Sequence, residues 1–114
     1  MAESVKKARP SISVIHLKGD FNLENRKLVE REWNEHLGKN PLAIAFNCKE
    51  LHYIDSSAIG TLVQFLTMAM NRDVKMVLCD VSESIYEIFK LACLNKFFTI
   101  TSMDEIMEKY RAKV

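Results

Sequence analysis

Glycine, proline and cysteine are scarce in this chain. Among its 114 residues there are only three Gly, two Pro and three Cys. Few Gly and Pro residues favour dense regular structure, because both residues mark turns and loops. Cys48, Cys79 and Cys93 are odd in number and form no C-x-x-C pair, which argues against a disulfide framework or a zinc site. We therefore expect reduced thiols in a cytoplasmic protein.

A one-sided charge and a long apolar run are also missing. The formal net charge is +1 with Lys and Glu interspersed, so the sequence has no basic footprint for nucleic acid. No apolar run approaches a membrane span, and the basic first ten residues lack the apolar stretch of a signal peptide. With 48% hydrophobic residues, the chain is predicted to form a single domain over residues 1–114. The sequence does not indicate an oligomeric state.

Motifs of common catalytic and metal sites are absent as well. There is no Gly-rich phosphate loop, no G-x-S-x-G and no H-E-x-x-H, and the three His residues lack metal-ligand spacing. His52 is close to Ser56 in sequence, but the side chains of a strand at 51–54 alternate between faces, and nothing supplies an oxyanion hole or a third orienting group. The sequence therefore predicts a protein that is not an enzyme and that holds neither a metal nor a cofactor.

Strand and helix patterns alternate along the chain. Short apolar runs predict strands at 11–18, 41–47, 74–79 and 97–101, the second and third of them buried on both faces. Capping residues and apolar spacing predict helices at 22–37, 56–71, 82–94 and 103–111. Residues 1–10 are expected to form a loose arm or a weak edge strand, since Pro10 interrupts any ladder. This order implies an α/β fold with a four- to five-stranded, mostly parallel sheet and about four helices.

One stretch of the chain, from Ser56 to Asn71, contains no Lys, Arg, Asp or Glu, although 27% of the residues are charged. It follows Asp55, and Asp and Ser are residue types that cap the first turn of a helix. Apolar spacing predicts a helix with a buried stripe made by Ile59, Leu62, Val63, Leu66 and Met70. A surface helix normally carries charge on its outer face, whereas this one would present Ser57, Thr61, Gln64 and Met68. We interpret this uncharged face as a docking surface for a protein.

Residues 53–60, Tyr-Ile-Asp-Ser-Ser-Ala-Ile-Gly, resemble the signature of the STAS family, the domain of bacterial anti-sigma factor antagonists. In that family, a partner kinase phosphorylates the first hydroxyl residue after the Asp, which corresponds to Ser56 here. Residues 17–22, Leu-Lys-Gly-Asp-Phe-Asn, are similar to a family turn that contributes to partner contact. Ala58 replaces the usual Gly and Asn22 the usual Asp. Both replacements are small, so they leave the expected fold unchanged and bear on kinase recognition.

The resemblance implies an anti-sigma factor antagonist switched by phosphorylation. Its unphosphorylated form would bind an anti-sigma factor Ser/Thr kinase and so release a sigma factor. That kinase would hold the ATP, and a phosphoserine phosphatase would be a second partner. A phosphate on Ser56 would add nearly two negative charges at a helix start, where the fold tolerates charge but an uncharged interface does not. The expected partner contacts are Asp20, Asn22, Asp55, Ser57, Ala58, Thr61, Gln64 and Met68.

Two alternatives stay open. Other members of the family serve as accessory subunits of lipid-transport or stress-signalling assemblies without phosphoswitching. A receiver-type domain would instead be phosphorylated on Asp55, but it needs an acidic pair after the first strand to hold Mg²⁺. Here that strand ends at Lys18-Gly19-Asp20, with a single acid, and no Lys directly follows the last buried strand. The sequence therefore favours the Ser56 hydroxyl over the Asp55 carboxylate as the phosphate acceptor.

Overall fold

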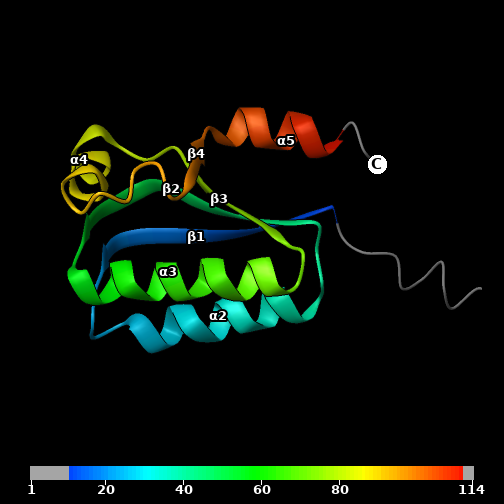
Figure 1. Cartoon of the computed structure of the whole chain (residues 1–114), viewed down its shortest axis with the longest axis horizontal. Coiled ribbons are helices and arrows are strands. Elements are labelled where there is room, and N and C mark those ends of the chain that lie inside the picture. The colour runs from blue at the N-terminus through cyan, green and yellow to red at the C-terminus, as the bar shows by residue number, and fades with distance from the viewer. Residues whose placement is uncertain (1–10, 112–114) are drawn as a thin grey trace, which may run out of the picture.

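A computed structural model describes residues 11–111 of the chain, so the prediction for residues 1–10 lies outside the described residues. Within this range four strands form one parallel sheet in the order β1-β2-β3-β4 (Figure 1). The strands are β1 (Ile12–Phe21), β2 (Ala43–Ile54), β3 (Lys75–Cys79) and β4 (Thr99–Thr101). The helices are α2 (Arg26–Gly38), α3 (Ser56–Asn71), α4 (Glu83–Leu91) and α5 (Met103–Arg111). The predicted α/β fold with a mostly parallel sheet is confirmed.

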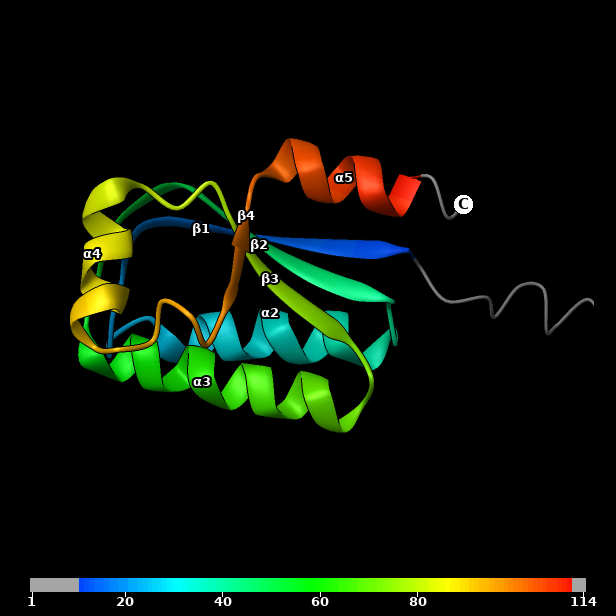
Figure 2. The same ribbon diagram turned by 45° about the horizontal axis from the view of Figure 1, so that its top comes forward.

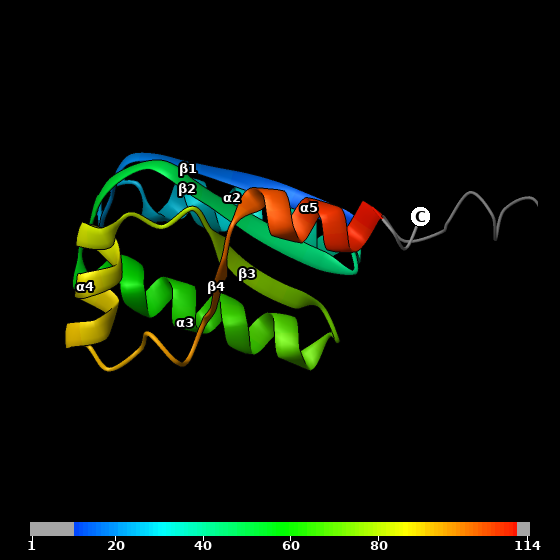
Figure 3. The ribbon, with the colours of Figure 1, turned by 90° about the horizontal axis from the view of Figure 1, so that it is seen from above.

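The helices are divided between the two faces and one end of the sheet. Helices α2 and α3 lie side by side on one face, and α5 lies on the opposite face (Figure 2). Helix α4 lies beyond the carboxyl ends of β1 and β2, next to the start of α3 (Figure 3). No helix of residues 11–111 is both long and apolar enough to cross a membrane.

Two apolar cores hold these layers together. The larger core, between the sheet and helices α2 and α3, contains Trp33 stacked on Phe65 with ring centroids 4.5 Å apart. The smaller core packs Ile106 and Tyr110 of α5 against Ala43 and Ala45 of β2. These short alanine side chains leave room for a helix to approach the sheet closely, whereas the bulky side chains of β2 point to the opposite face.

Strand β2 is longer than the sequence predicted, because it joins the expected strand at 41–47 and the strand end at 51–54. Its pairing with β1 is shifted twice, once between the partners of His16 and Lys18 and once between those of Gly19 and Asp20. Each shift inserts one extra residue into β2, as a β-bulge does. Cys48, Leu51 and Ile54 can therefore all join the larger core at three-residue spacing. The side chains of residues 48–54 therefore do not simply alternate between the two faces of the sheet, as the sequence predicted for 51–54.

Several element boundaries also differ from the prediction. Strand β1 continues through the predicted stop at Gly19 to Phe21, and α2 begins at Arg26 rather than at Asn22. The Asn22 side chain accepts hydrogen bonds from the Glu24 and Asn25 amides, so it stabilises a turn before the helix instead of capping the helix. Helix α4 ends at Leu91, before Asn95, and Cys93 has a left-handed backbone (φ 61°) that a helix cannot continue.

Candidate functional site

The predicted turn at Asp55 lies where the carboxyl end of β2 meets α3. Asp55 has an extended backbone (φ −97°, ψ 176°), and its Oδ1 accepts a hydrogen bond of 2.8 Å from the Ala58 amide. Asp55 is thus the N-cap of α3, as the sequence predicted. Ala58 lies within the helix and does not have a positive φ. The first turn is therefore helical with Ala in place of the family's Gly.

The second oxygen of Asp55 reaches a different part of the chain. Its Oδ2 accepts a 3.1 Å hydrogen bond from the Leu23 amide, in the turn between β1 and α2. The Asp55 amide also donates to the Phe21 carbonyl, 3.2 Å away. Asp55 therefore links the start of α3 to the turn that the sequence analysis singled out at Asp20 and Asn22.

The two serines after Asp55 differ in accessibility. Ser56 is exposed, whereas Ser57 is half-buried and its Oγ is buried without a hydrogen-bond partner among the described residues. Neither the Ser56 amide nor the Ser57 amide donates a hydrogen bond within residues 11–111. The accessible hydroxyl at the start of α3 thus belongs to Ser56, next to two free N–H groups.

The outer face of α3 differs from the predicted docking face. Thr61 is only 2% exposed, and its hydroxyl donates to the Ser57 carbonyl 3.0 Å away; Ala58 is fully buried. The prediction that Thr61 belongs to the outer face is therefore wrong, and neither Thr61 nor Ala58 offers surface to a partner. Gln64 and Met68 are exposed as predicted.

The error comes from the predicted stripe. The structure buries Phe65 and Ala69 and leaves Met70, a member of that stripe, 68% exposed. Small side chains such as Ala58 and Thr61 occupy the face that packs on the core, while Ile59, Val63 and Leu66 lie half-buried on its flank. The predicted stripe left out the buried Phe65 and included the exposed Met70, so it indicated a helix face rotated away from the true one.

The remaining predicted contacts lie in the turn between β1 and α2. Asp20 is exposed on β1, and Asn22 is half-buried directly after this strand. Because the Leu23 amide donates to Asp55, the structure brings this turn to the start of α3. Gln64 and Met68 lie further along the helix, more than one turn from Ser56.

A hollow of about 390 Å³ adjoins Ser56. Ser56 and Ile59 of α3 line it together with Tyr53 of β2 and Ile88 and Leu91 of α4. Two of its apolar side chains are well exposed, Tyr53 at 52% and Leu91 at 82%. Sequence reasoning missed the contribution of α4. The available signal was that Leu91 falls outside the i, i+3, i+4, i+7, i+8 apolar spacing of this helix, which is formed by Ile85, Ile88, Phe89, Ala92 and Cys93.

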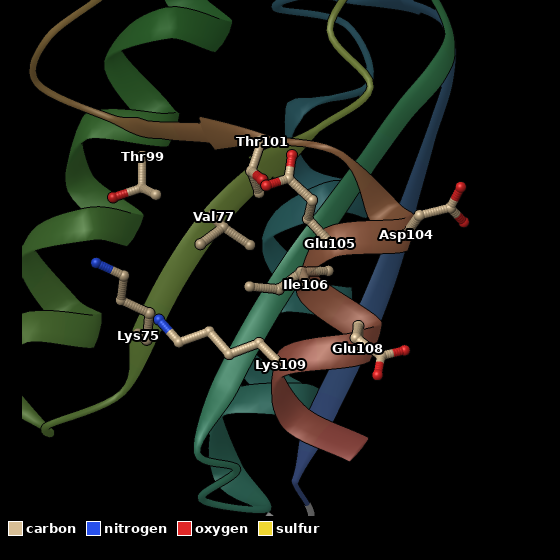
Figure 4. Close-up of a pocket in the computed structure, with 9 residues that line it drawn as sticks. All are labelled: Lys75, Val77, Thr99, Thr101, Asp104, Glu105, Ile106, Glu108 and Lys109. Atoms are coloured by element: carbon tan, nitrogen blue, oxygen red, sulfur yellow. The ribbon is translucent and has the colours of Figure 1, made fainter. Parts of the chain in front are cut away.

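A larger hollow, of about 700 Å³, lies between α5 and the strands β3 and β4 (Figure 4). Helix α5 covers the face of the sheet opposite α3 (Figure 1). Lys75 and Lys109 extend at one end, whereas Glu105 points toward Thr101 at the other (Figure 4). Its apolar floor is already covered, because Val77 is 1% exposed. This hollow carries charges of both signs, and its lining is more polar than that of the hollow beside Ser56, so it is a weaker candidate than the region around Ser56.

The cysteines do not contribute to the site around Ser56. Cys48 and Cys79 are buried and Cys93 is exposed, all three as free thiols. Burial raises the pKa of Cys48 to about 12. Burial, with a smaller contribution from the nearby Asp80 charge, raises the pKa of Cys79 to about 11. Both buried thiols therefore stay protonated at neutral pH, in the unreactive form.

Comparison with known proteins agrees with this fold. The structure of the anti-sigma factor antagonist SpoIIAA in its unphosphorylated form has 18% identity and a TM-score of 0.76 over 94% of this chain and 93% of that one. A putative anti-sigma factor antagonist from Thermotoga maritima has 21% identity and a TM-score of 0.77, and the match covers 89% of this chain and 88% of that one. A sulfate transporter family protein from Wolinella succinogenes has 14% identity and a TM-score of 0.79, and the match covers 96% of this chain and 93% of that one. At these identities the similarity shows a shared fold. The family model described as STAS domain matches residues 3–106, and the chain therefore belongs to the STAS domain family.

Proposed function

We propose that this protein is an anti-sigma factor antagonist that is switched by phosphorylation of Ser56. In its unphosphorylated form it binds an anti-sigma factor Ser/Thr kinase and releases a sigma factor. The chain itself is a binding module, and the kinase supplies the ATP. The observation that carries the proposal is the exposed Ser56 hydroxyl at the start of the uncharged helix α3, beside a hollow with apolar walls.

The start of α3 suits a residue that must carry a phosphate without unfolding the domain. The amides of Ser56 and Ser57 donate no hydrogen bond within the described residues, so they are available to phosphate oxygens. The positive end of the dipole of this 16-residue helix also favours an anion. The phosphorylated protein should therefore keep its fold.

The same phosphate opposes binding of the partner. Tyr53 and Leu91 expose apolar surface beside Ser56, and a partner that covers them must also remove water from Ser56. A phosphate there would bring nearly two negative charges into the interface. The two free amides do not neutralise this charge, and desolvating it costs several kcal/mol, which is enough to abolish a micromolar complex. The partner contacts proposed here are therefore Tyr53, Leu91 and the turn at Asp20 and Asn22, with Gln64 and Met68 at the edge.

Asp55 is a poor phosphate acceptor in comparison. Both of its carboxylate oxygens accept backbone hydrogen bonds, from Ala58 and from Leu23. Phosphorylation of this carboxylate would break one of these bonds and remove the negative charge that both rely on. This argument supports Ser56 over a receiver-type reaction at Asp55.

Mapping the phosphate tests the proposal. Candidate anti-sigma factor kinases of the source organism are each incubated with this protein and ATP, and the phosphate is located by mass spectrometry. We expect phosphate on Ser56 in the parent and in Ser57→Ala, and none in Ser56→Ala. Ser57→Ala is the matched control, because it removes a neighbouring hydroxyl whose oxygen is buried.

The outcomes separate the proposal from its alternatives. Phosphate on Ser57 alone would move the site by one residue, and a hydroxylamine-labile phosphate would indicate Asp55. Kinases that neither bind nor phosphorylate the parent would instead favour an accessory STAS subunit that works without phosphoswitching.

A further inference from the structure

We propose that Asp55 is a positioning residue for the partner surface. Its carboxylate accepts a hydrogen bond from the Leu23 amide and so fixes the turn of residues 22–25 beside Ser56. The kinase then contacts the turn and the phosphate acceptor as one surface. The inference rests on the proposed function. The inference goes beyond the proposed function because it gives Asp55, the Asp of the Asp-Ser-Ser sequence, a second role that is separate from capping α3.

The hydrogen bonds of the turn show what Asp55 supplies. The Asn22 amide donates to Asn25 Oδ1 at 2.9 Å, and the Glu24 and Asn25 amides donate to Asn22 Oδ1 at 3.0 and 3.2 Å. Of the four consecutive amides in the turn, only that of Leu23 finds its acceptor outside it, on Asp55 Oδ2. Among the amides of the turn, only that of Leu23 therefore depends on another segment. Its bond to Asp55, next to the bond between the Asp55 amide and the Phe21 carbonyl, ties the turn to the start of α3.

Apolar packing does little to fix this position. Leu23 is 61% exposed and Glu24 is also exposed, so neither side chain is part of a core. The Asn25 side chain ties the far end of the turn to the Asp20 carbonyl at 2.6 Å, which makes the turn a compact unit at the end of β1. The buried Phe21 anchors the start of this unit, and the Asn25 carbonyl, which accepts from the Leu28 and Val29 amides, joins its end to α2. The exposed middle of the turn, at Leu23 and Glu24, lacks such packing, and the bond to Asp55 is what holds it beside Ser56.

A carboxylate performs both tasks because it has two acceptor oxygens. An Asn side chain has one acceptor oxygen, and a Ser hydroxyl is too short to reach beyond its own helix turn. Both are good N-cap residues, so either can replace Asp55 as the cap of Ala58. Asp55→Ser and Asp55→Asn should therefore keep α3 intact and lose the bond to Leu23.

The first measurement follows the turn itself by NMR. In Asp55→Ser we expect amide hydrogen exchange at Leu23 to become at least tenfold faster, while exchange at Ala58 changes by less than threefold. Asp80→Asn is the matched control, because the Asp80 carboxylate likewise accepts a backbone hydrogen bond, from the Met103 amide at 3.3 Å. The Asp80→Asn variant also removes one carboxylate charge, at the end of β3, and it should leave amide exchange at Leu23 unchanged.

The second measurement follows phosphorylation by the kinase identified above. A displaced turn weakens recognition but not the chemical step, so KM for Asp55→Ser should rise at least fivefold while kcat stays within twofold. Asp55→Asn should behave in the same way, and Asp80→Asn should behave like the parent. A role limited to capping would leave KM unchanged in both Asp55 variants.

Each outcome decides between the two proposals. Unchanged Leu23 exchange in both Asp55 variants would overturn the positioning role. Faster Leu23 exchange with an unchanged KM would also overturn it, because the turn would then lie outside the partner surface. If no kinase phosphorylates the parent, the proposed function fails and the claim of a kinase surface fails with it, whereas the exchange data still report whether Asp55 holds the turn.

Discussion

Ser56 and Leu91 line the same hollow, although Ser56 begins α3 and Leu91 ends α4. They share it because β2 leads into α3 at the carboxyl end of the sheet, and α4 lies beyond that end (Figure 1). Open α/β sheets commonly bind their ligands beyond the carboxyl ends of the strands. The topology thus places an apolar side chain from a later helix beside the candidate phosphate acceptor.

Leu91→Ser tests whether this hollow is part of the partner surface. Leu91 is 82% exposed, so its replacement should change the free energy of unfolding by less than about 0.5 kcal/mol. An apolar anchor at an interface is worth considerably more, and we expect kinase affinity to fall at least tenfold, or about 1.4 kcal/mol. Isothermal titration with the kinase and denaturant unfolding give the two numbers.

Met70→Ser provides the control for that variant. Met70 is 68% exposed near the C-terminal end of α3 and does not line the hollow beside Ser56. This variant also removes an exposed apolar side chain, and kinase affinity should stay within twofold of the parent. Equal losses of affinity in the two variants would contradict a binding site centred on the hollow.

Much of this fold follows from residue patterns in the sequence. The apolar run around Ile44 predicted a buried strand, and Asp55 caps α3 as expected. Of the two serines that the sequence offered as the cap of α4, Ser82 and Ser84, the structure uses Ser82. These signals are local, because a cap needs only the next turn and a doubly covered strand needs only a continuous apolar run.

The remaining parts of the site depend on long-range packing. The bond between Leu23 and Asp55 joins segments that come together only when β1 pairs with β2. Burial of Thr61 depends on how α3 rotates against the core, and this rotation is fixed by tertiary contacts such as the stacking of Phe65 on Trp33. The same holds for Leu91, whose place beside Ser56 requires the path of the chain through β3 and α4.

Ile44→Asp tests the role of the central strand. Ile44 is fully buried in the larger core, between the pairings of β2 with β1 and β3. An unpaired carboxylate there has no partner and no water, so we expect a loss of stability well above the typical single-mutant value of about 1 kcal/mol. Fluorescence of Trp33, the only Trp in the chain, reports unfolding in denaturant. A variant as stable as the parent would contradict the burial of this position.

Ala58→Gly tests the departure from the family sequence at the first turn of α3. Ala58 is helical and fully buried, so restoring the family's Gly removes a methyl group from the core and adds backbone freedom. We expect a loss of about 1 kcal/mol from helix propensity, with a further loss from packing. Kinase affinity should stay within twofold, because Ala58 offers no surface. Denaturant unfolding and titration check the two statements, and a stabilised Gly variant would contradict them.

The buried thiols predict a loss of stability at alkaline pH. Folding raises the pKa of Cys48 from 9.0 to about 12 and that of Cys79 from 9.0 to about 11. Above pH 9 the unfolded chain therefore releases protons that the folded chain retains, and the unfolding free energy falls as pH rises toward 11. Denaturant midpoints measured from pH 8 to 11 should fall less steeply in a Cys48→Ala, Cys79→Ala double variant. Cys93→Ala, which removes the exposed thiol, should keep the slope of the parent.

Ser56→Asp tests the switch with a permanent charge. Asp is a competent residue near a helix N-terminus and its charge complements the helix dipole, so stability should change by less than about 1 kcal/mol. The carboxylate carries only part of the charge of a phosphate, yet it still lies beside the apolar side chains of Tyr53 and Leu91. Kinase affinity should therefore fall tenfold or more, or about 1.4 kcal/mol.

Ser56→Ala and Ser56→Asn separate the effect of charge from the effect of the substitution itself. The Asn side chain matches Asp in size and carries no charge, so Ser56→Asn should bind the kinase within threefold of the parent, as should Ser56→Ala. If Ser56→Asn loses as much affinity as Ser56→Asp, steric exclusion rather than desolvation of charge controls the interface. If Ser56→Asp binds as tightly as the parent, the start of α3 lies outside the interface and the phosphorylation switch proposed for this protein is wrong.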